Sequence, residues 1–297
     1  GFNPLRMDDN GPNPEFLFQL FSMMLRKAEN TRLETVEEAV VREAIATTLA
    51  GPSDQKTLPA FAGLLRGRIR ASSDDLNARL EKWLRHDQLG WLFNNIEDEF
   101  AWSGISGFDM THLLDDRLTR SVALMYIFHR LDELLDGTPT MIFLDEGWRL
   151  LEDDIFAEFI KNKMKTIRKF NGIIGFGTQS ASDIVAATIG KTIIEQCETH
   201  LLFPNPRADE DSHVKGLSLT AREFDWIKNS DPFTRSFLVK HGGDSLIASL
   251  KLDGMDDILK VLSGRGETVA ELDRLRAQVG DDPDVWLPIF SGIGNRI

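Results

Sequence analysis

Two short apolar runs joined by an amphipathic segment constrain the fold of this chain more than any other feature. Residues 140–144 and 172–177 are continuous apolar segments with the length of buried strands. Between them, apolar side chains recur at helical spacing over residues 153–169, and Asn171-Gly172 is a typical helix stop. Strands that alternate with helices predict a mainly parallel sheet with helices on both faces. The expected fold class is therefore α/β.

The alternation continues toward the end of the chain. A helix that begins at Ser180 leads to a third strand, expected at residues 199–203. Gly242-Gly243 separates two β-rich segments, which predicts a hairpin. The other expected elements are a short strand at 108–110, a buried helix at 117–136, hairpin strands at 235–240 and 245–250, and helices near Met255 and Glu267 before a tail with Trp286.

The first third of the chain shows helical periodicity and no clear strand pattern. Thr35 and Glu38 have the spacing of a capping box, and Gly51-Pro52 ends the helix that they begin. Two shorter helices are expected at residues 58–66 and 74–84.

We therefore predict a helical subdomain within an α/β core. The expected division is a core at residues 1–10 and 101–265, a helical subdomain at 11–100, and a C-terminal helical tail at 266–297.

Composition excludes several classes of protein. The single cysteine, Cys197, excludes internal disulfides, and no apolar run approaches the roughly 20 residues of a membrane-spanning helix. The net charge of −13 argues against a chain that grips DNA through its phosphates. The first residues show neither an initiator Met nor a signal pattern, and we expect them to follow a cut inside a longer chain.

The apolar run at residues 140–144 ends in two adjacent acids, Asp145 and Glu146. In open parallel sheets, ligands bind beyond the carboxyl ends of the strands. An Asp there can hold Mg²⁺, directly or through a water, and a neighbouring Glu can orient and polarise the water that attacks a phosphate. This is the Walker B pattern of nucleotide hydrolases. The same acid pair is also explained by its favourable charge at the start of a helix.

The second apolar run ends in Thr178-Gln179-Ser180. A polar amide at the tip of the neighbouring strand can contact both a γ-phosphate and the hydrolytic water. The alternative is an ordinary helix cap, with Ser180 as the N-cap and Asp183 at the third helical position. The two interpretations are compatible, because the cap leaves Gln179 free. Gln179 is therefore a catalytic candidate, and Thr178 is a candidate for nucleotide binding.

Several sequence blocks occur in order along nearly the whole chain. They are Gly1-Phe-Asn-Pro-Leu5, Phe108-Asp-Met-Thr111, Leu144-Asp-Glu-Gly-Trp-Arg-Leu-Leu151, Ile167-Arg-Lys-Phe-Asn-Gly172, Thr178-Gln-Ser-Ala-Ser-Asp183, Phe203-Pro-Asn-Pro206 and Phe237-Leu-Val-Lys240. Together they resemble the type IV secretion and conjugal transfer ATPases of the CagE, TrbE and VirB type, in their C-terminal ATPase domain.

The resemblance implies a RecA-like P-loop NTPase core with an inserted all-α subdomain. It implies ATP and Mg²⁺ as cofactors, with Asp145 holding Mg²⁺, Glu146 as the catalytic base and Gln179 as the γ-phosphate sensor. Hydrolysis would drive pilus assembly and the transfer of protein or DNA. Expected partners are other copies in a ring, expected to be a hexamer, together with inner-membrane subunits and other ATPases of the secretion system. The expected location is cytoplasmic and peripheral to the inner membrane.

The phosphate-binding Walker A loop, Gly-x-x-x-x-Gly-Lys-Ser/Thr, does not occur in the sequence. Residues 51–57 lack its second Gly, and Gly190-Lys191-Thr192 is preceded by Val185 where the first Gly is required. The family places this loop upstream of the first block. We therefore expect this chain to bind nucleotide weakly and not to turn over ATP by itself.

Four basic residues are candidates for contacts with the nucleotide or with a neighbouring subunit. Arg235 and Arg207 are candidate arginine fingers, supplied in trans within a ring. Arg168 is a further catalytic candidate, and Lys169 is a candidate for nucleotide binding. Surface salt bridges, or a solvated helix end that favours cations, explain the same residues.

Two other functions share part of these features. A DNA-translocating motor of the FtsK, HerA or coupling-protein type has the same core and acid pair, but the acidic net charge argues against it. A non-hydrolysing assembly scaffold would also lack the phosphate loop, but Asp145 and Glu146 would then have no reason to be intact. Direct nucleic-acid binding stays open.

Overall fold

The structure, a computed structural model, describes residues 1–28, 31–67, 75–100, 102–113, 116–146 and 154–292. It consists of two compact units. The first contains residues 1–197 with 215–217, and the second contains 198–214 with the residues from 218 onward. The boundaries predicted near residues 100 and 265 stay predictions.

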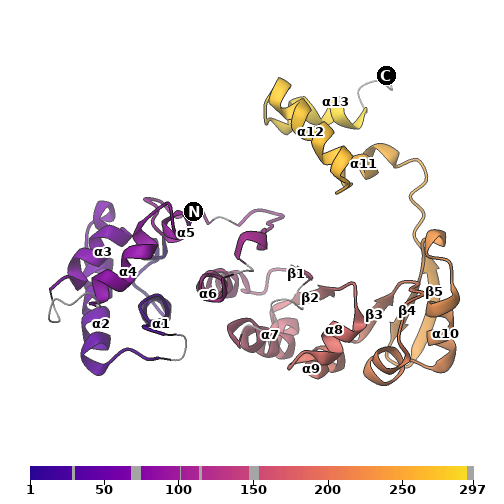
Figure 1. The fold of residues 1–297 in the computed structure, drawn as a ribbon, viewed down its shortest axis with the longest axis horizontal. Helices are drawn as coiled ribbons and strands as arrows, with labels where there is room; N and C mark the ends of the chain where they lie inside the picture. Colours follow the sequence, from indigo (N-terminus) through magenta and orange to yellow (C-terminus); the bar gives the residue numbers. More distant parts are fainter. Residues whose placement is uncertain (29–30, 68–74, 101, 114–115, 147–153, 293–297) are drawn as a thin grey trace. The chain divides into compact units, whose positions relative to one another are not determined.

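The amino-terminal part of the first unit is helical where it is described, as predicted (Figure 1). A 3-10 helix at Pro4–Arg6 precedes α1 (Asn13–Met24), α2 (Thr35–Ala50), a 3-10 turn at Ser53–Gln55, α3 (Leu58–Leu65), α4 (Leu76–Leu84) and α5 (Gly90–Phe93). The capping box lies one residue earlier than predicted, at Glu34 and Glu37. Helix α2 has already begun at Thr35, and the Glu37 carboxylate accepts the backbone N–H of Glu34 at 2.9 Å.

Helix α6 (Arg117–Leu134) is buried on two sides, which explains why its centre is apolar all round. One side, with Tyr126, packs against the amino-terminal helices and their buried Trp83 and Phe93. The other side, with Phe128, stacks on Phe159 of α7 (Asp154–Thr166). This helix therefore joins two hydrophobic cores of the first unit.

Asn3 fixes the first residues of the chain to the helical part. Its side chain is fully buried, and its amide nitrogen lies 3.0 Å from the carbonyl oxygen of Lys56, 2.8 Å from that of Asn95 and 3.0 Å from that of Ile96. Its amide oxygen accepts the backbone N–H of Leu5 at 3.1 Å. The first resemblance block, with Asn3 at its centre, thus has a structural role.

Asp98 links the same region to α6. Its carboxylate accepts the hydroxyl of Tyr126 and the guanidinium of Arg130, both at 2.5 Å. Burial, followed by the negative charge of Asp98, raises the pKa of Tyr126 above its usual value, so this hydroxyl stays a donor.

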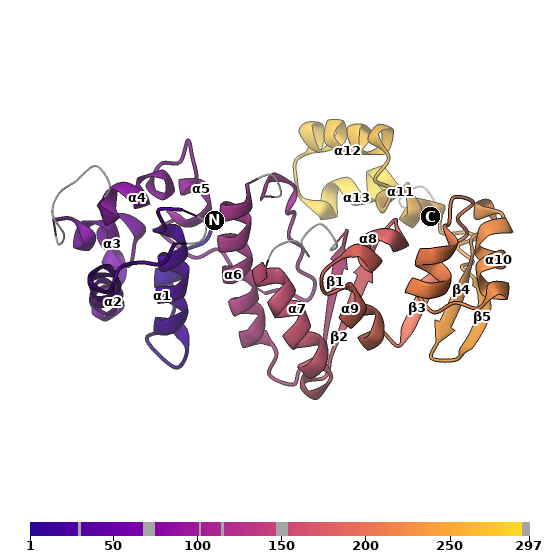
Figure 2. The same ribbon diagram turned by 60° about the horizontal axis from the view of Figure 1, so that its bottom comes forward.

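Strands β1 (Thr140–Asp145) and β2 (Gly172–Gly177) pair in parallel, as the two apolar runs predict (Figure 2). Helix α7 and a 3-10 turn at Ile167–Phe170 connect them, and Asn171 ends the turn in the left-handed conformation (φ 58°). The predicted first residue of this helix, Asp153, lies outside the described residues. After β2 come α8 (Ala181–Ala186) and α9 (Gly190–Gln196).

One face of this sheet is covered and the other is bare. Ile142, Leu144 and Phe176 pack against the core formed by α6, α7 and α9. On the opposite face, Met141 is 72% exposed and Phe143 and Ile173 are each 63% exposed. Among the described residues, β1 pairs only with β2.

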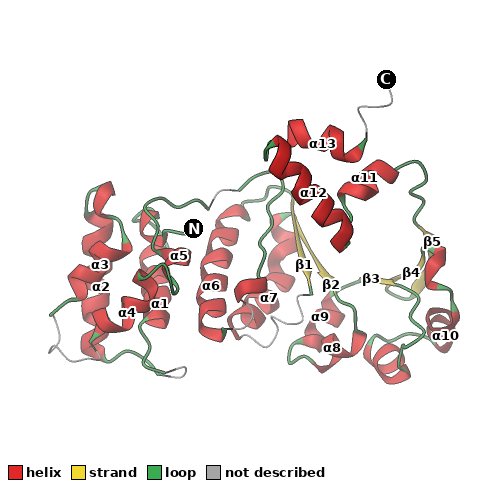
Figure 3. Cartoon of the chain, turned by 45° about the horizontal axis from the view of Figure 1, so that its top comes forward, coloured by secondary structure: helices red, strands yellow, loops and turns green. Residues whose placement is uncertain are grey.

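The third predicted strand does not belong to this parallel sheet. Strand β3 (Thr199–Leu202) pairs antiparallel with β4 (Ser236–His241) in the second unit, and β4 pairs with β5 (Asp244–Ser249) (Figure 3). The β4–β5 hairpin around Gly242-Gly243 is confirmed. Burial alternates along β3, which suits an antiparallel strand covered on one face.

The short strand predicted at residues 108–110 is wrong. No strand is found there, and a 3-10 turn follows at Thr111–Leu113. Phe108 instead stacks on Phe100 with ring centroids 5.4 Å apart, so its apolar character reflects aromatic packing rather than strand pairing.

The second unit adds helices to the β3–β4–β5 sheet. They are a π-helical turn at Asp211–Gly216, whose last residues belong to the first unit, α10 (Ala221–Asn229), a 3-10 turn at Pro232–Thr234, α11 (Asp256–Val261), α12 (Gly266–Val279) and α13 (Pro283–Ser291). Across the described part of the chain, none of the helices has the length and apolar character that crossing a bilayer would require.

A buried ion pair ties α10 to β4. Glu223 accepts the backbone N–H of Thr220 at 2.7 Å, and the Lys240 ammonium lies 3.1 Å from its carboxylate. Burial alone would raise the pKa of Glu223, but the Thr220 and Lys240 hydrogen bonds outweigh it and lower this pKa from 4.5 to about 2.

Acid is therefore expected to destabilise the second unit through Glu223. A carboxyl group with a depressed folded-state pKa contributes stability above its unfolded pKa and loses it as the pH falls toward the folded value. The contribution, about 2 to 3 kcal/mol at neutral pH, should disappear between about pH 4.5 and 2. Urea unfolding should show the difference between wild type and Glu223→Gln shrinking across this window. The exposed Glu267→Gln is the control, and a difference that stays constant from pH 7 to pH 3 would contradict the assignment.

Candidate functional site

The carboxyl ends of β1 and β2 lie level with each other. Asp145 is the register partner of Gly177, so Glu146 and Thr178 are the first residues to leave the sheet at the same edge. The parallel pairing thus brings together the two polar segments that the sequence singles out.

The Asp145 side chain is exposed and forms no hydrogen bond or ion pair within the described part of the chain. Gly177 leaves the space beside it open, because a Cβ atom added to Gly177 would lie 2.9 Å from Oδ1 of Asp145. Sequence reasoning missed this role of Gly177. The signal was present in Gly175-Phe-Gly177, a strand end without side chains at alternate positions.

Glu146 turns the chain away from the strand. It is half-buried and adopts the left-handed conformation (φ 50°), which costs a non-glycine residue about 1 kcal/mol or more. The rest of this resemblance block, residues 147–151, lies outside the described residues.

After β2, Thr178 and Ser180 form a local turn that leaves Gln179 exposed. The Thr178 hydroxyl accepts the backbone N–H of Ser180 at 3.2 Å. Ser180 occupies the N-cap position of α8, as predicted, but its hydroxyl bonds to that of Ser182 at 2.6 Å and makes no capping hydrogen bond. The Gln179 amide has no partner among the described residues, so it remains available to a ligand.

The donor set at this edge fits Mg²⁺. Magnesium in nucleotide sites is held by one or two protein oxygens, with waters and substrate phosphates as the other ligands. The accessible Asp145 carboxylate supplies one such oxygen. Within the described residues there is no group of three or more His, Cys, Asp or Glu side chains that would hold a metal without a substrate.

Two of the basic candidates lie away from this edge, and the other two belong to the second unit. Arg168 and Lys169 precede β2 and are exposed near its amino end, so the length of the strand, about 17 Å, separates them from Asp145. Arg207 lies in an exposed turn of the second unit, and Arg235, with a φ of 55°, directly precedes β4 there.

Comparisons with known proteins give a consistent result. Residues 111–227, which include both β1 and β2, match the TraG P-loop domain. The chain is 38% identical to the type IV secretion system protein virB4 of Bartonella henselae and 34% identical to the type IV secretion system protein PtlC of Bordetella pertussis, in each case over 98% of its length.

A solved structure is also similar. The structure of VirB4 of Thermoanaerobacter pseudethanolicus aligns with a TM-score of 0.55 and 18% sequence identity, covering 86% of this chain and 74% of that one. The chain spans only 37% of the length of the Bartonella relative and 36% of the Bordetella relative.

Proposed function

Because the chain belongs to the family of VirB4-type ATPases of type IV secretion systems, we propose that it forms part of the ATP-hydrolysing site of such a motor. The observation that carries this proposal is the parallel register of Asp145 with Gly177. It allows one bound nucleotide to be contacted from the ends of both strands.

Each polar residue at this edge has a proposed role. Asp145 holds Mg²⁺, directly or through a water, and Glu146 orients the attacking water and accepts its proton. Gln179 contacts the γ-phosphate from the neighbouring strand, and Thr178 supports nucleotide binding. When bound, Mg²⁺ neutralises charge on the phosphates. The left-handed Glu146 supports this assignment, since strained residues concentrate at functional sites.

We extend the proposal to a RecA-like core with an inserted helical subdomain. The parallel β1–β2 pair and the helices on its covered face support such a core. The helical residues 11–100 would be the insertion, residues 1–10 and 101–265 the core, and residues 266–297 a helical tail.

The motor is proposed to work as a ring of identical subunits, expected to be a hexamer. Either Arg235 or Arg207 would act as an arginine finger and complete the site of the next subunit in trans, since both are exposed. Arg168 and Lys169 lie near the amino end of β2, away from Asp145, so their proposed role is a contact with a neighbouring subunit. Inner-membrane subunits and other ATPases of the secretion system would be partners, at the cytoplasmic side of the inner membrane. Hydrolysis would drive pilus assembly and the transfer of protein or DNA.

Asp145→Asn tests the magnesium assignment. In the protein expressed from its complete gene, the Mg²⁺ concentration for half-maximal ATP turnover should rise roughly tenfold or more, because a carboxylate ligand is replaced by a neutral amide. Asp9→Asn, at an exposed residue of the same unit, is the charge-matched control. An unchanged Mg²⁺ requirement would remove Asp145 from the metal site.

The 297-residue chain by itself is expected to show no ATP turnover, because its sequence contains no phosphate-binding loop. Phosphate release measured with malachite green should stay at the level of a blank. Release at the rate of the complete gene product would show that phosphates are held by other residues of this chain.

A further inference from the structure

Strand β5 is an end strand of the three-stranded antiparallel sheet in the second unit (Figure 3). The backbone N–H of Leu250 donates to the carbonyl of Arg235 at 3.2 Å, so these two residues form a hydrogen-bonded pair of the β4–β5 ladder. Such pairs alternate along an antiparallel ladder, and the backbone groups of Ser245, Ile247 and Ser249 therefore point away from β4. Within the part of the chain that the structure describes, no other backbone group bonds to these three residues.

The sequence and register of β5 lack the usual features that keep an open edge from pairing. An open edge is a template for another strand, and many proteins block it with Lys, Pro or a bulge. Residues Asp244–Ser249 contain no Lys, Arg or Pro, and their register with β4 is continuous. Leu246 and Ile247, which lie on opposite faces of the strand, are both more than half exposed. The edge is therefore suited to receive a further strand.

The residues of β5 are complementary to themselves in an antiparallel arrangement. When Ile247 lies opposite the same residue of a second copy, Ser245 of each strand lies opposite Ser249 of the other, and all three outward-facing residues form hydrogen-bonded pairs. A register shifted by two residues leaves one of the three without a partner in β5. On the other face, the unshifted register places Leu246 opposite Ala248 of the second strand, which adds an apolar contact.

Charges at the two ends of the strand favour the same arrangement. The strand begins with Asp244, and Lys251 follows closely after its last residue; both side chains are exposed. Antiparallel pairing brings Asp244 of each copy next to Lys251 of the other, whereas parallel pairing would bring the two Asp244 carboxylates together. Asp253 lies two residues further on, beyond Leu250, the last residue that bonds to β4. The edge thus fits a second copy of itself.

We propose that two copies of this chain associate through β5, antiparallel and with Ile247 against Ile247, so that their three-stranded sheets join into one of six strands. The contact is symmetric and ends at two copies, so it differs from the head-to-tail contact that a ring requires. It needs neither nucleotide nor Mg²⁺ and does not depend on the proposed ATPase function. Because a strand edge buries little surface, the association is weak.

Sedimentation velocity of the 297-residue chain without nucleotide tests the proposal. A monomer–dimer equilibrium is expected between about 1 and 200 µM chain, in about 0.15 M sodium chloride, which screens the repulsion between two acidic chains. Ile247→Lys should weaken the dimer about tenfold or more, because it places two ammonium groups directly opposite each other. Ile289→Lys adds the same charge at an isoleucine of α13 with nearly equal exposure, 57% against 55%, and should change the affinity less than about twofold.

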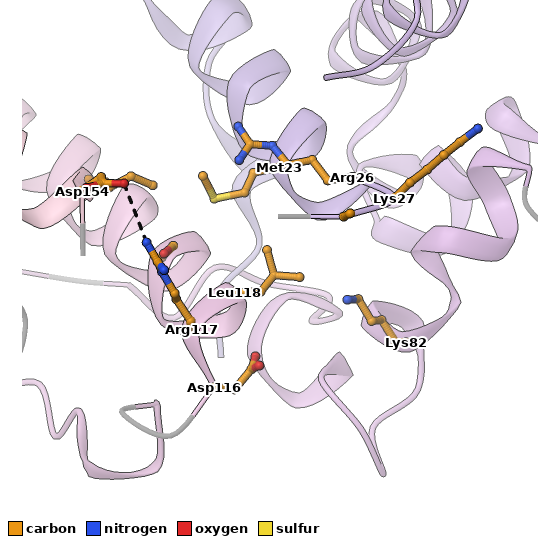
Figure 4. Close-up of a pocket in the computed structure, with 11 residues that line it drawn as sticks. Met23, Arg26, Lys27, Lys82, Asp116, Arg117, Leu118 and Asp154 are labelled. Carbon is orange, nitrogen blue, oxygen red and sulfur yellow. Dashed lines mark ion pairs between the residues drawn. The ribbon is translucent and has the colours of Figure 1, made fainter. Parts of the chain in front are cut away.

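A charge exchange tests the register. Asp244→Lys and Lys251→Asp should each weaken the dimer about threefold or more, and the double variant should return to within about twofold of the wild type. Asp154→Lys makes the same reversal at a 97% exposed side chain of the first unit, which lines a pocket together with Arg117 (Figure 4), and should leave the dimer unchanged. Thermal unfolding of each variant verifies that it is folded.

Three results would overturn the proposal. The first is a chain that stays monomeric over the whole concentration range, and the second is a dimer that Ile247→Lys weakens no more than Ile289→Lys does. The third is a pair of charge reversals that have no effect singly or whose effect the double variant does not reverse. A dimer that survives Ile247→Lys but is lost in Phe143→Lys would lie at the bare face of β1 and β2 instead.

Discussion

Replacing Glu146 with glutamine in the protein expressed from its complete gene is expected to lower ATP turnover by about 100-fold or more, with nucleotide binding retained. The amide keeps the size and hydrogen-bonding ability of the side chain, but it cannot accept a proton from the attacking water. Because Asp145 is unchanged, Mg²⁺ and nucleotide should still bind. Steady-state phosphate release and the affinity for a fluorescent ATP analogue measure the two effects separately.

Glu158→Gln is the matched control for this substitution. Glu158 is an exposed residue of α7 in the same unit, so its replacement changes the net charge by the same amount away from the strand edge. It should leave turnover within twofold of the wild type. A Glu146→Gln protein that keeps more than a tenth of the wild-type rate would exclude Glu146 as the base.

Replacing Asn3 with alanine is expected to lower the free energy of unfolding of the first unit by about 2 to 4 kcal/mol. The substitution removes the donor shared by the carbonyls of Lys56, Asn95 and Ile96 and leaves these groups with a cavity in place of a partner. It also removes the acceptor for the backbone N–H of Leu5. Urea unfolding followed by helical circular dichroism measures the loss.

The control for Asn3 is Asn162→Ala, an exposed position on α7 of the same unit. Its effect should stay within about 0.5 kcal/mol, as for most surface substitutions. A loss of the same small size for Asn3→Ala would mean that the first residues contribute little to the stability of the helical part.

The strand pair and the position of its acids were predictable because local signals and topology agree. Residues 140–144 and 172–177 have the length and apolar character of strands, and the helix between them has a clear stop at Asn171. The expected cover on both faces was wrong for the described residues, because Met141, Phe143 and Ile173 are exposed. Parallel pairing then follows from the connection, and it brings the carboxyl ends of the two strands to the same edge. The exact register, with Asp145 beside Gly177, comes from the structure.

The partner of β3 was not predictable in the same way. A strand of four residues carries little pattern, and its pairing with β4 joins Leu201 to Val239, almost forty residues away along the chain. The strand prediction for residues 108–110 was wrong for a related reason. An apolar segment that packs through an aromatic ring resembles a strand in sequence. The role of Asn3 depends on three carbonyl groups more than fifty residues away, which no local pattern reveals.

The bare face of β1 and β2 has a practical consequence for handling the protein. Met141, Phe143 and Ile173 present methyl, thioether and phenyl groups to water, on a kind of sheet that is normally covered on both sides. At low ionic strength, electrostatic repulsion between molecules of charge −13 prevents the bare faces of two molecules from associating. Added salt screens that repulsion, and sulfate also strengthens apolar association, so sodium sulfate should bring this chain out of solution.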